Sequence, residues 1–366
     1  MNSHKNIRFY NDDDKEKYDN FLMERSDAYV FHTVEWKNVI EKTFKYKPLY
    51  IIAIDDDNNI CAILPLFFIN NFFKKKLVSV PFFSFGGFLG DKKYIPALIK
   101  KVFELKDKLH CKSITIKQSP NSNIYQTSLE NAGMFRIEIR LNHYIELKDK
   151  NIDEIWMNIS DKNRGTIRKA KKKDVIIERL TREEDLEDLH LLEIITRKKI
   201  GLLSPSINYY KNMWRELNPK NYLYILIAKH YGKIIAFAIF FVFNNRVVHV
   251  HVGSNNKGRK LGANNLILWS AIEYCCEKGY EIFDLGASVL DGKGNITENF
   301  KGIYFYKNSF NTINVPYSWY YYPKNMINID LVSKQNFLII TGKKILRRFP
   351  LTLYSKTGTF LIKKLL

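Results

Sequence analysis

The sequence predicts an α/β protein, of the α+β kind, built from two related halves with mixed sheets flanked by helices. Two apolar runs, residues 49–54 and 60–69, flank a turn-rich segment, and the same arrangement returns at 222–228 and 234–243. Paired runs of this kind are typical of β-hairpins. Because the arrangement occurs twice, we interpret the chain as a duplicated α/β fold.

Each predicted hairpin leads into a strand, a helix and a second strand. Strand-like runs at 77–87 and 246–253 both end at glycine. The helices that follow are predicted from apolar residues that recur about every 3.6 positions. These residues are Ile95, Leu98, Ile99, Val102 and Leu109 in the first half and Leu268, Ile272, Cys275 and Cys276 in the second. Short strands at 113–117 and 281–285 then complete the same order of elements in both halves.

A polar segment at residues 148–155 marks the boundary between the two halves. We therefore predict one domain at 1–150, a second at 151–323 and a distinct tail at 324–366. Within the tail, residues 331–366 carry lysines and arginines between apolar residues and contain no acid. This pattern predicts a basic helical pair, broken at Pro350, that lies on an anionic membrane surface. The alternative is a helix packed on the protein's own core.

The composition describes a folded, strongly basic chain. Its 366 residues, 46% hydrophobic and 14% aromatic, are enough for a sizeable core, which excludes a disordered chain. The apolar runs are far shorter than the roughly 20 residues of a spanning helix, and residues 1–14 lack the apolar core of a signal peptide. We expect a cytoplasmic protein, at the inner face of the membrane if the tail binds lipid. The net charge of +20 favours polyanionic partners.

The sequence offers no anchor for metal or hydrolase chemistry. Its cysteines lie in apolar segments without C-x-x-C spacing, so we expect buried, reduced thiols and no metal site. They are Cys61, Cys111, Cys275 and Cys276. No nucleophile elbow, zinc-protease motif or Walker loop is present, so direct transfer between two bound substrates is what remains.

Short strings spread over residues 28–322 match one known family. They lie at 31–36, 46–48, 64–66, 78–81 and 85–87 in the first half, and at 162–164, 167–170, 197–201, 283–286 and 302–307 in the second. In these strings the chain resembles the Fem-type (FemAB-like) family of tandem acetyltransferase-like, or GNAT-like, proteins. The resemblance implies two tandem GNAT-like domains. It also implies an N-acyltransferase or aminoacyltransferase that moves its group onto an amine.

The resemblance further implies which substrates to expect. The donor would be acyl-CoA or aminoacyl-tRNA, with no tightly bound cofactor. The acceptor would be the amine of a cell-envelope polysaccharide or peptidoglycan precursor, phosphorylated or lipid-linked. The alternative is a non-catalytic nucleic-acid-binding protein, or a peripheral membrane scaffold with a degenerate acetyltransferase fold. The donor, the acceptor and the oligomeric state stay open.

A basic cluster at residues 161–173 sets seven cations against one acid, Asp161. The cations are Lys162, Arg164, Arg168, Lys169, Lys171, Lys172 and Lys173. On a helix Arg164 and Arg168 project together and can fork around phosphate oxygens. With the resemblance, we predict that Lys162, Arg164 and Arg168 bind substrate phosphates or the tRNA backbone. The alternative is a solvated helix face.

Arg259, Gly262 and Asn264 form a partial version of the loop with which acetyltransferase-like enzymes hold a pyrophosphate. If coenzyme A is the donor, this loop is expected to bind it. The alternative is a connecting loop in which Asn264 or Asn265 caps the following helix.

His249 and His251 alternate with valines on a predicted strand, so both imidazoles are expected on one face of that strand. In the acetyltransferase-like fold this strand lines the reaction cleft, where an imidazole is suited to take the proton of the amine. We predict both as catalytic residues, the alternative being structural histidines. Lys307, surrounded by aromatic residues, is predicted to bind an anionic substrate group. Its alternative is an edge-strand lysine.

In the first half, Trp36 is a candidate wall of the acceptor groove, with core packing as the alternative. Phe85, Gly86 and Gly87 form a turn that admits close approach of a ligand to the backbone, or a plain tight turn.

Overall fold

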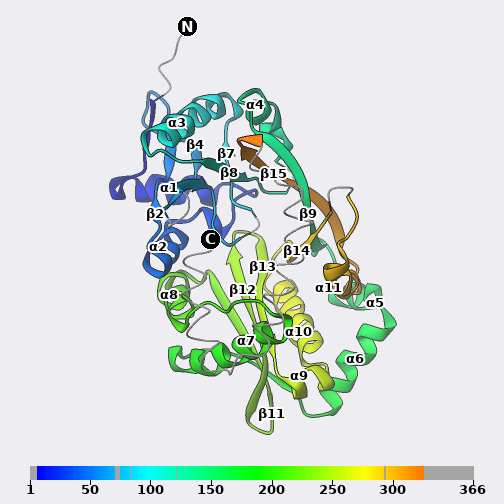
Figure 1. The fold of residues 1–366 in the computed structure, drawn as a ribbon. Helices are drawn as coiled ribbons and strands as arrows, with labels where there is room; N and C mark the ends of the chain where they lie inside the picture. The colour runs from blue at the N-terminus through cyan, green and yellow to red at the C-terminus, as the bar shows by residue number, and fades with distance from the viewer. Residues whose placement is uncertain (1–5, 71–74, 84, 121, 292–293, 325–366) are drawn as a thin grey trace. The chain divides into compact units, whose positions relative to one another are not determined.

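The computed structural model describes residues 6–70, 75–83, 85–120, 122–291 and 294–324. These residues form two compact units (Figure 1). Unit 1 comprises the described residues of 1–142, 289–297 and 315–332, and unit 2 those of 143–288 and 298–314. The chain thus leaves and re-enters each unit, whereas each predicted domain is one continuous block of sequence. The predicted basic tail, 331–366, lies outside the described residues.

Unit 1 holds two sheets and the helices that cover them. Its helices are α1 (Lys15–Met23), α2 (Val34–Phe44), α3 (Ile95–Lys108) and α4 (Gln126–Asn131). Its strands are β1 (Asn6–Phe9), β2 (Lys47–Pro48), β3 (Ile51–Ile54), β4 (Ile60–Leu64), β5 (Phe67–Asn70), β6 (Lys75–Val78), β7 (Leu89–Gly90) and β8 (Ser113–Lys117). The long strands β9 (Phe135–Glu146) and β15 (Ile313–Tyr322) each contribute most of their length to this unit.

The strands of unit 1 are ordered β1-β3-β4-β7 in one sheet and β15-β8-β6-β5-β2 in the other. Between β4 and β5 the chain passes Pro65, which has no N–H to donate to a ladder, so one strand ends before it and another begins after it. Helix α3 buries Leu98, Ile99 and Val102 in the core of the unit. The predicted hairpin and the predicted helix are therefore confirmed in this half.

Unit 2 has one run of five neighbouring strands with helices on both faces. Its strands are β10 (Ile176–Arg179), β11 (Leu223–His230), β12 (Lys233–Phe243), β13 (Arg246–Ser254) and β14 (Ile282–Val289), hydrogen-bonded in that order. Its helices are α5 (Ile152–Asn158), α6 (Asp161–Lys172), α7 (Leu186–Ile200), α8 (Ile207–Leu217), α9 (Asn256–Leu261), α10 (Ala263–Glu277) and α11 (Glu298–Asn308). All pairings in this run are antiparallel except β13 with β14, which is parallel.

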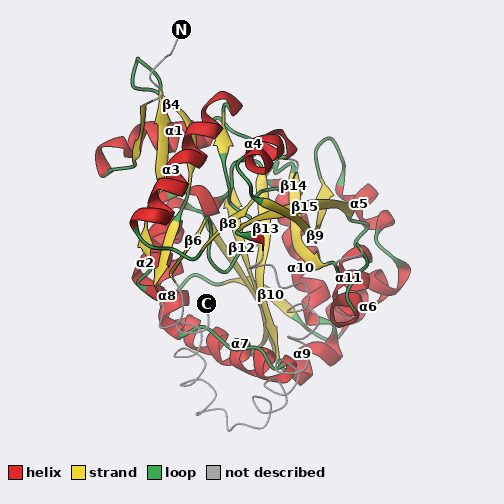
Figure 2. Ribbon diagram, turned by 45° about the horizontal axis from the view of Figure 1, so that its top comes forward, coloured by secondary structure: helices red, strands yellow, loops and turns green. Residues whose placement is uncertain are grey.

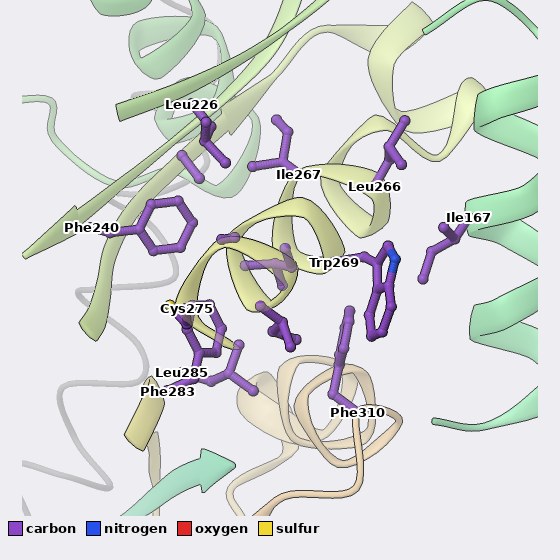
Figure 3. Packing of buried hydrophobic residues seen from close by; sticks show 14 of the residues in the cluster. Ile167, Leu226, Phe240, Leu266, Ile267, Trp269, Cys275, Phe283, Leu285 and Phe310 are labelled. Carbon is purple, nitrogen blue, oxygen red and sulfur yellow. The ribbon is translucent and has the colours of Figure 1, made fainter. Parts of the chain in front are cut away.

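The core of unit 2 lies between this run of strands and helix α10. Side chains at every second position of β12 point toward α10, among them Phe240, and meet Ile267 and Phe283 (Figure 3). Trp269 of α10 packs on Trp156 of α5 with ring centroids 4.7 Å apart. Helix α7 packs against β12 and β13 from the other face (Figure 2). The sheet therefore holds its side chains rigidly on both faces.

The two units repeat one order of elements, as predicted. Each has an antiparallel hairpin, β3–β4 or β11–β12, and later a strand that pairs in parallel with the strand following helix α3 or α10. Unit 1 adds β5 and β7 to this order, and β7 lies between the first parallel strand and α3. The parallel pairs are β6 with β8 and β13 with β14. The first of these strands is shorter than predicted, because β6 ends at Val78 and Phe82 adopts a φ of 69°, which no strand accommodates. No helix in the described part of the chain is long and apolar enough to span a bilayer.

Candidate active site

The candidate site of unit 2 lies where the parallel strands β13 and β14 part. Their pairing covers Arg246–Val248 against Ile282–Asp284, and both strands continue past it. Gly286, two residues further along β14, has a φ of 73°. A Cβ atom on this glycine would lie 3.5 Å from the carbonyl oxygen of His249 and 3.8 Å from the Nζ of Lys307. The glycine, the histidine and the lysine are therefore neighbours.

Lys307 brings a partly buried cation to this point. It lies on α11 rather than on an edge strand, which was the alternative to a binding role, and its Nζ donates a hydrogen bond to the carbonyl oxygen of Ala287 at 2.9 Å. Burial lowers the pKa of Lys307 to about 8, although the carboxylate of Asp284 favours the charged form. The Asp284 carboxylate accepts a hydrogen bond from the Gly286 N–H at 2.7 Å. At neutral pH the lysine is an ammonium held in a largely desolvated place.

His249 is held neutral beside this ammonium. Its ring packs on Phe240, with centroids 5.3 Å apart. Burial, and next to it the positive charge of Lys307, lower the pKa of His249 to about 3. Its Nε2 is buried and makes no hydrogen bond with any residue that the structure describes. An imidazole with so low a pKa is a poor proton acceptor near neutral pH, but it can exchange a hydrogen bond with a substrate.

The expectation that His249 and His251 share one face of the strand is wrong. A bulge in the β12–β13 ladder pairs Phe240 with His249 but Ile239 with His251, and leaves Val250 as the extra residue. Phe240 and Ile239 are consecutive on β12 and point to opposite faces, so their partners do too. Strand alternation alone cannot reveal an inserted residue, which is why the sequence pattern misled.

His251 belongs to a separate buried cluster beneath α7 and α8. Its Nε2 lies 3.2 Å from the hydroxyl of Tyr209, and its Nδ1 lies 3.7 Å from the carboxylate of Glu193. The Nε of Arg197 donates to that same carboxylate at 2.5 Å. Burial opposes ionisation of Glu193, but the charge of Arg197 and the hydrogen-bonding contacts of His251 and Arg197 outweigh it and lower the pKa of Glu193 to about 2. The His251 ring therefore faces a fixed carboxylate.

Helix α6 confirms the predicted basic helix, but Arg164, one of its two predicted phosphate ligands, is hydrogen-bonded within the chain. The guanidinium of Arg164 donates to Asp161 and to the carbonyl oxygen of Met157, which closes the end of α5. Arg168 lies over the ring of Trp156 at 5.5 Å. Lys162 is exposed, as are the lysines near the end of the helix. The exposed face of α6 thus carries Arg168 as well as the lysines, whereas Arg164 is not directed to solvent as a phosphate fork.

The loop around Arg259, Gly262 and Asn264 is in contact with α6. The Arg259 guanidinium donates to the carbonyl oxygen of Ser254, and the Asn264 amide to the hydroxyl of the same serine at 3.2 Å. A Cβ on Gly262 would lie only 2.5 Å from Thr166 of α6. Gly262, at a φ of 76°, precedes the first residue of α10. The turn expected to hold a pyrophosphate is therefore covered on the side of Gly262 by another helix.

The predicted site residues of unit 1 lie in a packed aromatic group. Trp36 is 0% exposed, and its ring centroid lies 4.8 Å from that of Phe83. Phe85 packs on Tyr29 at 4.5 Å. Gly86 has a φ of 142°, and a Cβ on Gly87 would lie 1.9 Å from Gln118. Trp36 therefore packs as a core residue, and residues 85–87 have the features of a tight turn, which were the alternatives to substrate binding.

Several residues of the two clusters in unit 2 were not named as site residues from the sequence. Glu193 and Arg197 are four apart on α7, a spacing that signals a helical ion pair. Tyr209, which contacts His251 in the same cluster, comes from α8, and no local pattern connects α7 with α8. Asp284 and Gly286 lie in a string that was noticed only for the family resemblance.

Comparisons with known proteins agree with this architecture. Residues 161–307 match the family model for an acetyltransferase (GNAT) domain. This segment therefore has the fold of a GNAT domain. It contains α6, the strands β11–β14, α10 and Lys307, and so includes both histidine clusters.

Solved structures extend the similarity to both units. The crystal structure of FemX superimposes with a TM-score of 0.72 at 15% identity, over 89% of this chain and 99% of FemX. The C-terminal domain of a proposed lysylphosphatidylglycerol synthetase from Agrobacterium fabrum gives 0.61 at 13% identity, over 88% and 95%. A tandem GNAT protein from the clavulanic acid biosynthesis pathway gives 0.55 at 12% identity, over 86% and 98%. No curated protein matches at the level of sequence.

These similarities show a tandem GNAT fold, and they confirm the resemblance to the Fem-type family. The chain accordingly has the fold of acyl and aminoacyl transferases.

Proposed function

We propose that this protein transfers an acyl or aminoacyl group to an amine of a cell-envelope precursor, with the chemistry in unit 2. One observation carries the proposal. At the point where β13 and β14 of the GNAT domain part, Lys307, Gly286 and His249 come together, and Lys307 keeps its charge despite burial. Ionisable groups with strongly shifted pKa values, gathered at a break in a sheet, are typical of functional sites.

The reaction in this proposal is aminolysis of an ester or thioester. The amine nitrogen of the acceptor bonds to the carbonyl carbon of the donor, and the C–O or C–S bond to the leaving group breaks. The amine loses a proton and the leaving group takes one up. Negative charge develops on the carbonyl oxygen, so a desolvated cation or a preorganised N–H beside it lowers the barrier.

In this scheme the Lys307 ammonium binds an anionic substrate group or the developing oxyanion. His249 gives or accepts a hydrogen bond through its buried Nε2 and is not the base, because its pKa lies near 3. His251 is the better candidate for a proton acceptor, because its ring is the one of the two that faces a carboxylate, that of Glu193 at 3.7 Å. The two histidines, on opposite faces of β13, cannot share one proton transfer.

Of the two donors, we favour aminoacyl-tRNA over acyl-CoA. Two observations support this choice. Thr166 packs against Gly262, where a pyrophosphate would have to approach the start of α10, and Arg259 is hydrogen-bonded within its own loop. The exposed lysines of α6 offer a face for a nucleic-acid backbone.

For the acceptor, FemX and the lysylphosphatidylglycerol synthetase domain suggest a phosphorylated or lipid-linked precursor of the cell envelope. Residues 331–366 would then bring the protein to the anionic inner face of the membrane.

The experiment is a transfer assay with both donors. Purified full-length protein is incubated with radiolabelled aminoacyl-tRNA, or with labelled acyl-CoA, and with lipid-linked and nucleotide-linked amino-sugar and peptide acceptors. We expect a labelled amide from aminoacyl-tRNA, with the tail-deleted chain less active only on membrane-bound acceptors. Binding of tRNA without any product would instead support a non-catalytic nucleic-acid-binding protein. Product from acyl-CoA alone would overturn the choice of donor but not the transferase.

A further inference from the structure

A second pair of cations lies in unit 1, on a single indole ring. Lys117 of β8 is directly opposite Trp319 of β15 in their antiparallel pairing, and its Nζ lies 4.6 Å from the centroid of the indole. The guanidinium of Arg140, on the neighbouring strand β9, lies 4.8 Å from the same centroid. Both cations are thus held against one aromatic ring by three strands of a sheet, which is a rigid arrangement.

Hydrogen bonds within the chain fix Lys117 but leave donors over. Lys117 is only 8% exposed, and its Nζ donates a hydrogen bond to the carbonyl oxygen of Phe83 at 2.8 Å. Its backbone N–H donates to Ser79 at 2.9 Å, and its carbonyl accepts from Gly86 at 3.0 Å. The Nε of Arg140 is buried and, among the described residues, has no hydrogen-bond partner. The two side chains can therefore offer several N–H groups to a ligand.

The electrostatics of this place are unfavourable without an anion. Burial lowers the pKa of Lys117 to about 7, and the other charges that shift it, those of Arg140 and Lys76, are also positive. A buried ammonium without a counter-charge destabilises a folded protein, and removing the charge in favour of an apolar side chain would be stabilising. An anion that enters and pairs with the two cations would remove this electrostatic cost.

We propose that Lys117 and Arg140, held on Trp319, form a binding site for an oxyanion, the phosphate or carboxylate group of a small molecule. Arginine offers a planar fork of donors and lysine a compact point charge, and both groups recognise phosphate and carboxylate oxygens. The site is built entirely from unit 1, and it stands whether or not unit 2 performs the transfer proposed above.

Thermal unfolding of the full-length protein tests this site. Inorganic phosphate, diphosphate and acetate are titrated at constant ionic strength, with sodium chloride as the balancing salt. At anion concentrations above the dissociation constant, the unfolding midpoint of the wild type should rise by about 2 °C or more for each tenfold increase in the free anion concentration. Lys117→Met should abolish this rise, and Arg140→Gln should weaken the apparent affinity at least about tenfold.

The matched control is Lys106→Met. Lys106 also lies against an aromatic ring of unit 1, Tyr322 at 5.6 Å, but it is paired with Asp107. This variant should keep the full anion response. A rise with phosphate and diphosphate alone assigns the site to phosphate, and a rise with acetate alone assigns it to carboxylate.

Two results overturn the proposal. One is that the anion raises the unfolding midpoint of Lys117→Met as much as that of the wild type. The other is that sodium chloride alone raises the midpoint of the wild type as much as phosphate, diphosphate or acetate does. Should Lys117→Met fail to fold, labelling of the wild type with acetic anhydride gives an independent measurement by mass spectrometry. The anion must then slow acetylation of Lys117 and leave that of Lys106 unchanged, and equal rates at Lys117 with and without the anion refute the site.

Discussion

Replacing Lys307 by methionine should change the stability of the protein in a pH-dependent way. The folded state lowers the pKa of this lysine from 10.5 to about 8, so it binds the proton less tightly than the unfolded chain does. Protonation of Lys307 therefore costs stability below pH 8, and the cost disappears as the pH rises toward 10.5. The linkage relation gives a cost of about 3.4 kcal/mol at pH 7 and about 1 kcal/mol at pH 10.

The assay is guanidinium denaturation of the wild type and Lys307→Met at pH 7 and pH 10. Packing differences between lysine and methionine contribute equally at both pH values, so only the change between them is used. The stability gained by the variant should shrink by about 2.5 kcal/mol from pH 7 to pH 10. Lys301→Met on the same helix is the control, because Lys301 is half exposed and paired with Glu298. An equal gain at both pH values would show that Lys307 is not a desolvated cation, and the reasoning about the site would fail.

Further predictions concern the surroundings of the site. Glu193→Gln should lower the free energy of unfolding by about 3–5 kcal/mol at pH 7, because Arg197 loses its buried partner. In the wild type, the stability contributed by the ionised Glu193 should be lost as the pH falls from 4.5 toward 2, and denaturation at graded pH measures this loss. Gly258→Ala should destabilise by about 1–3 kcal/mol, because its Cβ would lie 2.4 Å from the backbone oxygen of Ile235. Gly165→Ala on α6, with nothing within 4 Å, should instead stabilise by about 0.5–1 kcal/mol, and thermal melts of the two variants decide between these signs. Lys162→Met, on the exposed face, should weaken tRNA binding in filter assays without loss of stability, and unchanged binding would remove α6 from the interface.

The elements of the fold could be predicted because the signals that specify them are local. A turn-rich segment between apolar runs specified β11 and β12, and a stripe of apolar residues specified α10. The end of β6 could not be predicted, because the loop after Val78 is fixed by hydrogen bonds to β8, such as that from Gly86 to the carbonyl of Lys117.

The candidate site was predicted only in part. The importance of Lys307 came from the family resemblance, but its place on a helix and its contact with Ala287 depend on how α11 packs. The opposite orientation of His249 and His251 follows from one bulged residue, which leaves no trace in composition or alternation.

Contacts between distant parts of the chain escape sequence reasoning altogether. Lys117 and Trp319 are brought together by the pairing of β8 with β15, two strands about 200 residues apart in the chain. Nothing near either residue in the sequence marks it as part of a cation pair.

The most direct test of the account is a single-turnover measurement of transfer by the wild type and by Lys307→Met, with labelled aminoacyl-tRNA in excess acceptor. A buried ammonium that stabilises the reacting group predicts a rate about 10²-fold or more lower in the variant, with Lys301→Met unchanged. Equal rates in the wild type and Lys307→Met would contradict the assignment of the chemistry to this site.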